Sequence, residues 1–125
     1  MNYLFRLDGE VPSKKNSRIN LQNRKSIPSK AYQEWHSTTI ASLFCQAVRQ
    51  KIKTPISGPV TICVEFCHKN LHRKDSDNGL SSILDALVDA AILKDDNWQI
   101  VTNIIVENSL SVLGVASCKI TVMEL

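Results

Sequence analysis

Residues 60–68, VTICVEFCH, alternate strongly apolar side chains with smaller or polar ones. Successive side chains of a β-strand point to opposite faces. One face of this stretch would therefore carry the larger apolar residues and the other the remainder, namely Val60, Ile62, Val64 and Phe66 against Thr61, Cys63, Glu65 and Cys67. Residues 55–59, PISGP, contain the breakers that precede it. The pattern predicts a core strand.

Helical periods flank this strand on both sides. Upstream, AYQEWHSTTIASLFCQAVRQKI (31–52) repeats apolar residues every three or four positions, which predicts an amphipathic helix from Ser29 to about Lys53. Downstream, the apolar residues between Leu80 and Ala91 follow the same spacing, which predicts a second helix from about Asp77 to Ala91. Its expected N-cap is Asp75, Ser76 or Asp77.

The two ends of the chain supply the remaining strands. NYLFRLD (2–8) alternates, while WQIVTNIIVEN (98–108) and ASCKITVMEL (116–125) are rich in β-branched residues. The predicted order is β-α-β-α-β-β. This order indicates an α+β fold with a single mixed sheet of about four strands and two main helices on a face. At 125 residues we expect a single domain, residues 1–125. Trp98, at the start of a predicted strand, is interpreted as a core or interface residue rather than a base-stacking platform.

Composition suggests the compartment. No run approaches the roughly 18 apolar residues of a membrane span, and the N-terminus lacks the order of a signal peptide. We therefore expect a cytoplasmic protein, in which disulfides are improbable. The cysteines are predicted to be buried free thiols: Cys45, Cys63, Cys67 and Cys118. Zinc binding by Cys63, Cys67 and the adjacent His68 is a weaker alternative, because no second paired motif accompanies them.

Positive charge gathers near the N-terminus, although the net charge is only +3. No acidic residue lies between Glu10 and Glu34, where six basic residues are interleaved with Asn, Gln and Ser: Lys14, Lys15, Arg18, Arg24, Lys25 and Lys30. This composition suits contact with phosphates. A solvated polar loop is the alternative.

Carboxylates gather in residues 73–97, RKDSDNGLSSILDALVDAAILKDDN, which hold half of the twelve acidic residues. Asp75 or Asp77 could simply cap the helix. Asp95 and Asp96, however, follow the C-terminus of that helix, where its dipole disfavours negative charge. A cation would compensate, and hard oxygen ligands in this number suit Mg²⁺ or Mn²⁺. The neighbouring Arg73 and Lys74 point to a phosphate-bearing substrate.

The same residues resemble a known family. Asp75-x-Asp77-Asn78, then Asp85-Ala86-Leu87, then Asp95-Asp96 before a β-branched strand, resembles the signature of RusA-type Holliday junction endonucleases. VPSKKNSR (11–18) and YQEW (32–35) resemble the basic loop and the start of the first helix of that family. The likeness covers most of the chain.

The resemblance implies a homodimer that binds four-way DNA junctions and cuts two strands symmetrically with Mg²⁺ or Mn²⁺ in recombination and repair. It implies that Asp75, Asp77 and Asp96 are the catalytic metal ligands, with Asp95 as a further candidate. Asp85 either supports the site or is a solvated helix residue. We expect hydrolysis by a metal-activated water without a covalent intermediate. His36, His68 and His72 lack the partners of a nucleophilic triad.

Two features complicate this interpretation. The family pattern usually has a lysine four residues after the second aspartate, where this chain has Ser81. A slow enzyme, a non-catalytic junction-binding protein, or a metal-binding protein unrelated to DNA therefore stay open. Moreover, the ends of the second helix lie on the order of 20 Å apart. Either the KDDN loop (94–97) folds back along the helix, or Asp96 of a second subunit completes the site, and we favour the second alternative.

Overall fold

The fold is one mixed sheet covered on one face by two helices. The computed structural model describes residues 1–13, 18–20, 26–72 and 76–125, with the side chains of 18–20, 26 and 76–78 outside that description. The helices are α1 (Lys30–Arg49) and α2 (Ser76–Asp89). The strands are β1 (Asn2–Asp8), β2 (Arg18–Asn20), β3 (Ser26–Pro28), β4 (Val60–His68), β5 (Val101–Leu110) and β6 (Ser117–Glu124). Within the described residues, no helix is both long and apolar enough to cross a membrane.

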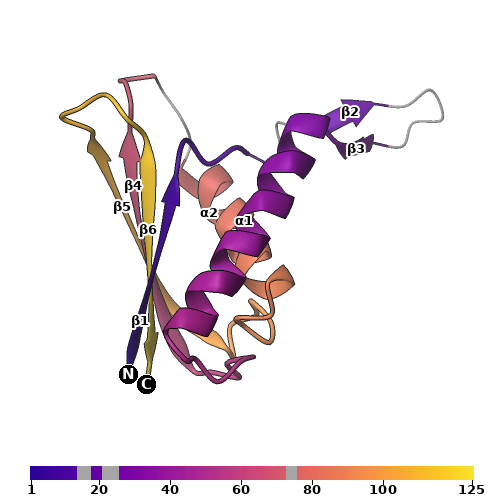
Figure 1. Ribbon diagram of the computed structural model, residues 1–125, viewed down its shortest axis with the longest axis vertical. Helices are drawn as coiled ribbons and strands as arrows, with labels where there is room; N and C mark the ends of the chain where they lie inside the picture. Colours follow the sequence, from indigo (N-terminus) through magenta and orange to yellow (C-terminus); the bar gives the residue numbers. More distant parts are fainter. Residues whose placement is uncertain (14–17, 21–25, 73–75) are drawn as a thin grey trace.

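The strand order of the main sheet is β1-β6-β4-β5. β6 pairs antiparallel with both β1 and β4, whereas β4 and β5 run parallel. A parallel pair needs a crossover connection, and α2 supplies it between β4 and β5. Both helices lie on the same face of the sheet, with α1 towards β1 (Figure 1). The α+β class, the single mixed sheet and the order of these elements are as predicted.

The core lies between the sheet and the helices. The apolar face of β4 is buried as its alternation predicts, with Val60, Ile62 and Val64 fully inaccessible. Leu43 of α1 and Leu87 of α2 are equally buried in the same cluster. Each such side chain contributes about 1.5–3 kcal/mol through burial. This core fixes the height at which α2 lies above β4 and β5.

Helix α1 begins as predicted and ends earlier. The Ser29 hydroxyl caps it by accepting a hydrogen bond from the Tyr32 backbone N–H at 3.1 Å. The helix ends at Arg49, not at Lys53, because Lys51 takes a left-handed conformation with φ 56°. The Ile52 N–H then bonds back to the Ala47 carbonyl, and Ile52 still packs on the core. Because Ile52 is apolar and packs on the core, it continues the helical spacing of the sequence although it lies beyond the end of α1.

Two local features differ from the predictions. The short antiparallel pair of β2 and β3 was not predicted. β5 begins at Val101, and the preceding Trp98 is 77% exposed, so of the two predicted roles, core or interface, the core is wrong and the interface stays a prediction. The cause is Asn97, whose side-chain oxygen accepts hydrogen bonds from the N–H groups of Gln99 and Ile100. These bonds form a turn where the β-branched composition predicted a strand.

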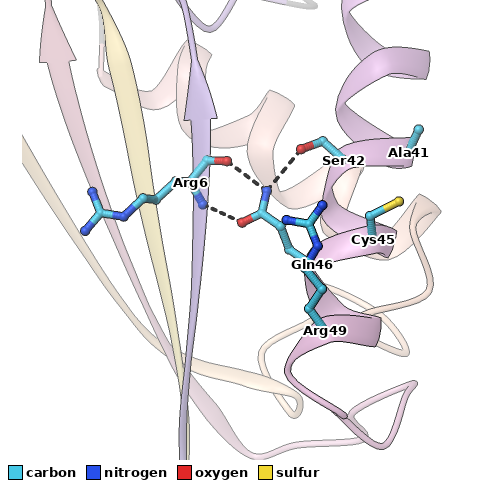
Figure 2. Close-up of a pocket in the computed structure, with 6 residues that line it drawn as sticks. All are labelled: Arg6, Ala41, Ser42, Cys45, Gln46 and Arg49. Atoms are coloured by element: carbon cyan, nitrogen blue, oxygen red, sulfur yellow. Dashed lines mark hydrogen bonds between the residues drawn. The ribbon is translucent and has the colours of Figure 1, made fainter.

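Two glutamines cover the outer edge of β1, namely Gln46 of α1 and Gln50, the C-cap residue of that helix. Gln46 accepts a hydrogen bond from the Arg6 N–H at 2.8 Å and donates one to the Arg6 carbonyl at 2.9 Å. Gln50 makes the same pair of bonds with the backbone of Leu4, at 3.0 and 2.7 Å. The Gln46 amide also donates to the Ser42 hydroxyl, beside a shallow pocket (Figure 2). Each carboxamide takes the place that the backbone of a further strand would occupy.

The four cysteines are free thiols, as predicted, but they are not all buried. Cys118 is buried, Cys63 and Cys67 are half-buried, and Cys45 is exposed on α1, so the prediction of burial was wrong for Cys45. Burial, with a smaller contribution from Glu65, raises the pKa of the Cys118 thiol to about 12. Cys118 therefore stays protonated at neutral pH.

Candidate metal and DNA site

The predicted metal ligands belong to α2 and to the segments at its two ends. Asp77 lies in the first turn of α2, and its side chain is outside the described part of the structure. Asp95 and Asp96 lie on the exposed loop between α2 and β5. Arg18 belongs to β2, and its side chain is likewise not described. Other predicted residues fall outside the described residues altogether: Asp75, Lys14, Lys15, Arg24, Lys25, Arg73 and Lys74.

The loop that carries Asp95 and Asp96 is anchored by backbone hydrogen bonds. Ala91 takes a left-handed conformation with φ 59°, which turns the chain at the end of α2. The Lys94 N–H then donates to the Ile56 carbonyl at 2.9 Å, and the Ile56 N–H donates to Ile92 at 2.8 Å. Just beyond, Gly58 lies so close to Ile100 that a Cβ there would stand 2.7 Å from its backbone. Hydrogen bonds and close backbone packing therefore fix the loop that carries the two carboxylates.

Within this loop the carboxylate of Asp95 accepts two local hydrogen bonds. One carboxylate oxygen accepts the Asp96 backbone N–H at 2.7 Å, and the other accepts the Asn97 side-chain amide at 3.0 Å. These hydrogen bonds lower the pKa of the Asp95 carboxyl below its ordinary value. Asp95 is thereby kept ionised, and it holds the backbone in the conformation that presents Asp96.

The pKa of Asp96 is shifted in the opposite direction. Partial desolvation raises the pKa of its carboxyl, and the neighbouring Asp95 and then the charge of Asp85 on α2 raise it further. A bound cation would relieve this repulsion, and carboxylate oxygens are the ligands of Mg²⁺ and Mn²⁺. In the part of the chain that the structure describes, no group of three acidic, histidine or cysteine residues is assembled into a metal site. Asp96 and Asp95 therefore fit a divalent cation as part of a larger donor set.

The two halves of the predicted donor set lie at opposite ends of α2. This helix has 14 residues, so its ends are about 20 Å apart. The loop after α2 folds back far enough for Asp85 to act on Asp96. Asp85 is itself eight residues from Asp77, or about 12 Å along the helix axis. Folding back of the loop towards Asp85 therefore leaves about 12 Å of helix between that residue and Asp77.

The N-terminal half of α2 is held against β4 and against the chain that enters the basic segment. Gly79 lies on the ring of Phe66, where an added Cβ would approach to 3.1 Å. The buried Ser82 hydroxyl donates a 2.6 Å hydrogen bond to the Pro12 carbonyl. The Glu10 carboxylate accepts the Lys69 N–H at 3.2 Å and lies 3.6 Å from the His68 ring. These contacts hold residues 10–12 and the end of β4 near the N-terminal half of α2.

Sequence reasoning missed Glu10, Ser82 and a contact between the helices. His36 of α1 and Asp89 of α2 form an ion pair or hydrogen bond at 2.7 Å. Asp89 is therefore used in joining the helices. The sequence drew attention to Asp89 only as a member of the acidic segment. It could not indicate the pairing with His36, because the two residues are 53 positions apart.

A comparison with models of protein families identifies the family of this chain. The family model for the endodeoxyribonuclease RusA matches residues 8–122, nearly the whole chain. The chain belongs to the RusA family. Its members are endodeoxyribonucleases that resolve Holliday junctions, so RusA membership assigns this general activity to the chain. No curated protein sequence gives a significant match. The RusA match includes both ends of α2 and the N-terminal basic segment.

Proposed function

We propose that this RusA-family chain is a Mg²⁺- or Mn²⁺-dependent endonuclease that resolves four-way DNA junctions by paired symmetric nicks in recombination and repair. The metal ligands and catalytic carboxylates are Asp75, Asp77 and Asp96, with Asp95 as a further ligand. The observation that carries the proposal is the anchored loop after α2, in which Asp95 accepts the Asp96 N–H at 2.7 Å and both carboxylates are exposed side by side. Adjacent carboxylates repel each other, and a bound cation relieves that repulsion.

In this proposal different residues orient the metal ligands and bind the DNA. When bound, the cation supplies an activated water and stabilises negative charge on the phosphate and the leaving oxygen. Asp95 orients the Asp96 backbone, and the contacts of Ile56 with Ile92 and Lys94 hold that loop. DNA phosphates would be bound by basic residues that follow Pro12 in the sequence and by two that directly precede α2: Lys14, Lys15, Arg18, Arg24, Lys25, Arg73 and Lys74. No side chain needs to act as a covalent nucleophile.

The proposed active unit is a homodimer in which each site takes Asp96 from the partner subunit. The support is the length of α2, which separates Asp77 from Asp96 of the same chain. A two-fold dimer also provides two sites, one for each of the paired cuts. The metal, the dimer and the shared site are parts of the proposal beyond the general nuclease activity.

Ser81 supports a second candidate, a junction-binding protein with weak or absent cleavage. Ser81 is exposed on α2, four residues after Asp77, where the family pattern has a lysine. A lysine there would neutralise phosphate charge in the transition state, and its loss can cost on the order of 100-fold in rate. The two candidates differ in cleavage and share junction binding.

A cleavage assay on a synthetic four-way junction separates them. We expect paired nicks with Mg²⁺ or Mn²⁺ and none with chelator, and loss of cutting with retained binding for Asp96→Asn. The control is Asp8→Asn, which removes an exposed carboxylate on β1 far along the chain from α2. Junction binding without cutting in either metal would reject the enzyme and leave the binding protein. Cutting by Asp96→Asn at the wild-type rate would reject the proposed ligand set.

A further inference from the structure

An exposed tryptophan follows the candidate ligand Asp96 by two positions. The Trp98 side chain is 77% exposed on the loop between α2 and β5. Tryptophan side chains are highly buried on average, because their large apolar surface contributes strongly to stability when it leaves water. Two residues of chain span at most about 7 Å, so the indole lies beside the candidate metal site. Its exposure there calls for a role outside the core.

The backbone around Trp98 is held by the hydrogen bonds that also hold Asp96. The Asn97 side-chain amide donates to the Asp95 carboxylate at 3.0 Å, and its side-chain oxygen accepts the Gln99 N–H at 3.0 Å. The same Asp95 carboxylate accepts the Asp96 N–H at 2.7 Å. Trp98 therefore lies in a turn whose position relative to Asp96 is fixed. A group held in this way loses little freedom when it binds a partner.

The surroundings of Trp98 do not resemble the centre of a protein interface. Its exposed neighbours in the chain are all polar: Lys94, Asp95, Asp96, Asn97 and Gln99. A protein interface instead surrounds its aromatic anchors with a desolvated, apolar core. The exposed apolar side chains of the loop after β5 lie at the other end of that strand (Figure 1): Val112, Leu113 and Val115. Trp98 thus fits a planar partner that covers a single ring face.

The charges of the loop favour a nucleobase over a phosphate as that partner. Asp95 and Asp96 directly precede the turn and repel phosphates through their negative charge. The indole of Trp98 is uncharged, and the bases are the uncharged, planar parts of DNA. Stacking between a base and an aromatic side chain tolerates any sequence, because every base has a π-face. Bases next to a phosphodiester held at Asp96 would come within reach of the indole.

We propose that Trp98 stacks on a nucleobase of branched DNA at the point where the base stack is interrupted. In a continuous duplex each base is covered on both faces by its neighbours. A branch point interrupts that stack and leaves a base face for the indole. The exposure and polar surroundings of Trp98 thus reverse the preference that the sequence alone indicated, a core or interface residue. The inference rests on the proposed binding of branched DNA and adds the side chain that recognises the interruption.

The first test is the fluorescence of Trp98. In a Trp35→Phe background Trp98 is the only tryptophan of the chain. We expect a synthetic four-way junction to quench its emission in the presence of chelator, where no cleavage takes place, because stacking on a base quenches an indole. A continuous duplex of the same sequence should quench much less. Junction binding without quenching would overturn the proposal, and so would equal quenching by the duplex.

The second test is the affinity for the same junction, measured by fluorescence anisotropy with chelator. Trp98→Ala should weaken binding by about 5- to 150-fold, the range that corresponds to the loss of one stacked base. Trp98→Phe keeps a ring and should bind nearly as tightly as the wild type. Gln99→Ala is the matched control, because Gln99 is the exposed neighbour in the same turn. An unchanged affinity of Trp98→Ala would overturn the proposal.

Two further measurements separate the stacking from other roles of the loop. The mass of Trp98→Ala in solution should equal that of the wild type, and a changed mass would overturn the proposal by placing the indole in a contact between copies. Cleavage by the wild type with Mg²⁺ is an independent measurement. Quenching without cleavage would support the stacking and reject the nuclease, whereas cleavage without quenching would reject the stacking alone.

Discussion

The hydroxyl of Ser82, on α2, donates a hydrogen bond of 2.6 Å to the carbonyl oxygen of Pro12, 70 positions away along the chain. Pro12 directly precedes the basic segment, and α2 carries the candidate ligand Asp77 at its start. This bond fixes α2 to the residue at which the chain enters the proposed phosphate-binding segment. It also satisfies a buried hydroxyl, since Ser82 is fully inaccessible.

We predict that Ser82→Ala lowers the free energy of unfolding by about 1–3 kcal/mol, because the Pro12 carbonyl loses its partner. Urea denaturation measures the change. Ser81→Ala is the matched control, because Ser81 is the exposed neighbour on the same helix. Equal stabilities of the two variants would show that the bond contributes nothing net.

Replacing Ser81 with lysine should restore the missing cation of the family pattern. Position 81 is exposed, so α2 can accommodate the longer side chain without disturbing the core. We predict that Ser81→Lys increases the rate of junction cleavage by about 10- to 100-fold. Single-turnover cleavage on a labelled junction measures it. Ser81→Gln provides length without charge and should leave the rate near that of the wild type. A rate unchanged by Ser81→Lys would mean that another basic residue already supplies this charge.

Mixed dimers test whether the site is shared. In a heterodimer of Asp77→Asn and Asp96→Asn subunits, sharing places both substitutions in one site and leaves the other intact. We therefore predict that mixing the two inactive variants restores cutting, and that the product is a singly nicked junction. Denaturing and native gels distinguish one nick from paired resolution. If Asp77 and Asp96 acted within the same chain, both sites of the heterodimer would be defective and no cutting would return.

Cys118 should make the stability of the protein depend on alkaline pH. Its pKa is about 12 in the folded chain against an ordinary 9.0, so folding favours the protonated thiol. Its contribution is complete below about pH 9 and is lost as the pH rises towards about 12, because the unfolded thiol ionises first. Wild type should therefore lose more unfolding free energy than Cys118→Ala over this interval. Urea denaturation at the two ends of the interval measures it, and parallel losses would contradict the prediction.

The fold was predictable because its main signals are local. The alternation in residues 60–68 and the helical periods on either side are set by which faces are buried. The errors arose where a side chain or a backbone turn overrides composition. Ile52 packs on the core from beyond the end of α1, and Asn97 bends the chain where β-branched residues follow. Such effects depend on three-dimensional contacts that no periodicity reports.

The sequence indicates the kind of candidate site, a cluster of carboxylates that suits a cation. It does not indicate how these residues are arranged. The placement of Asp95 and Asp96 after a helix indicated a cation, because the helix dipole opposes them. Their different states, with Asp95 held ionised by hydrogen bonds and the pKa of Asp96 raised, depend on the turn at Asn97 and on Asp85. The contacts of Glu10 and Ser82 link positions 59 and 70 residues apart, which one sequence without its fold does not associate.

The two glutamines at the β1 edge also limit how the sheet can grow. Gln46 and Gln50 occupy the outward hydrogen-bonding groups of Arg6 and Leu4, so a strand of another chain cannot pair with the backbone at these two positions. An unpaired strand edge is a template for aggregation. Removing both carboxamides would therefore expose an edge that a further chain could extend.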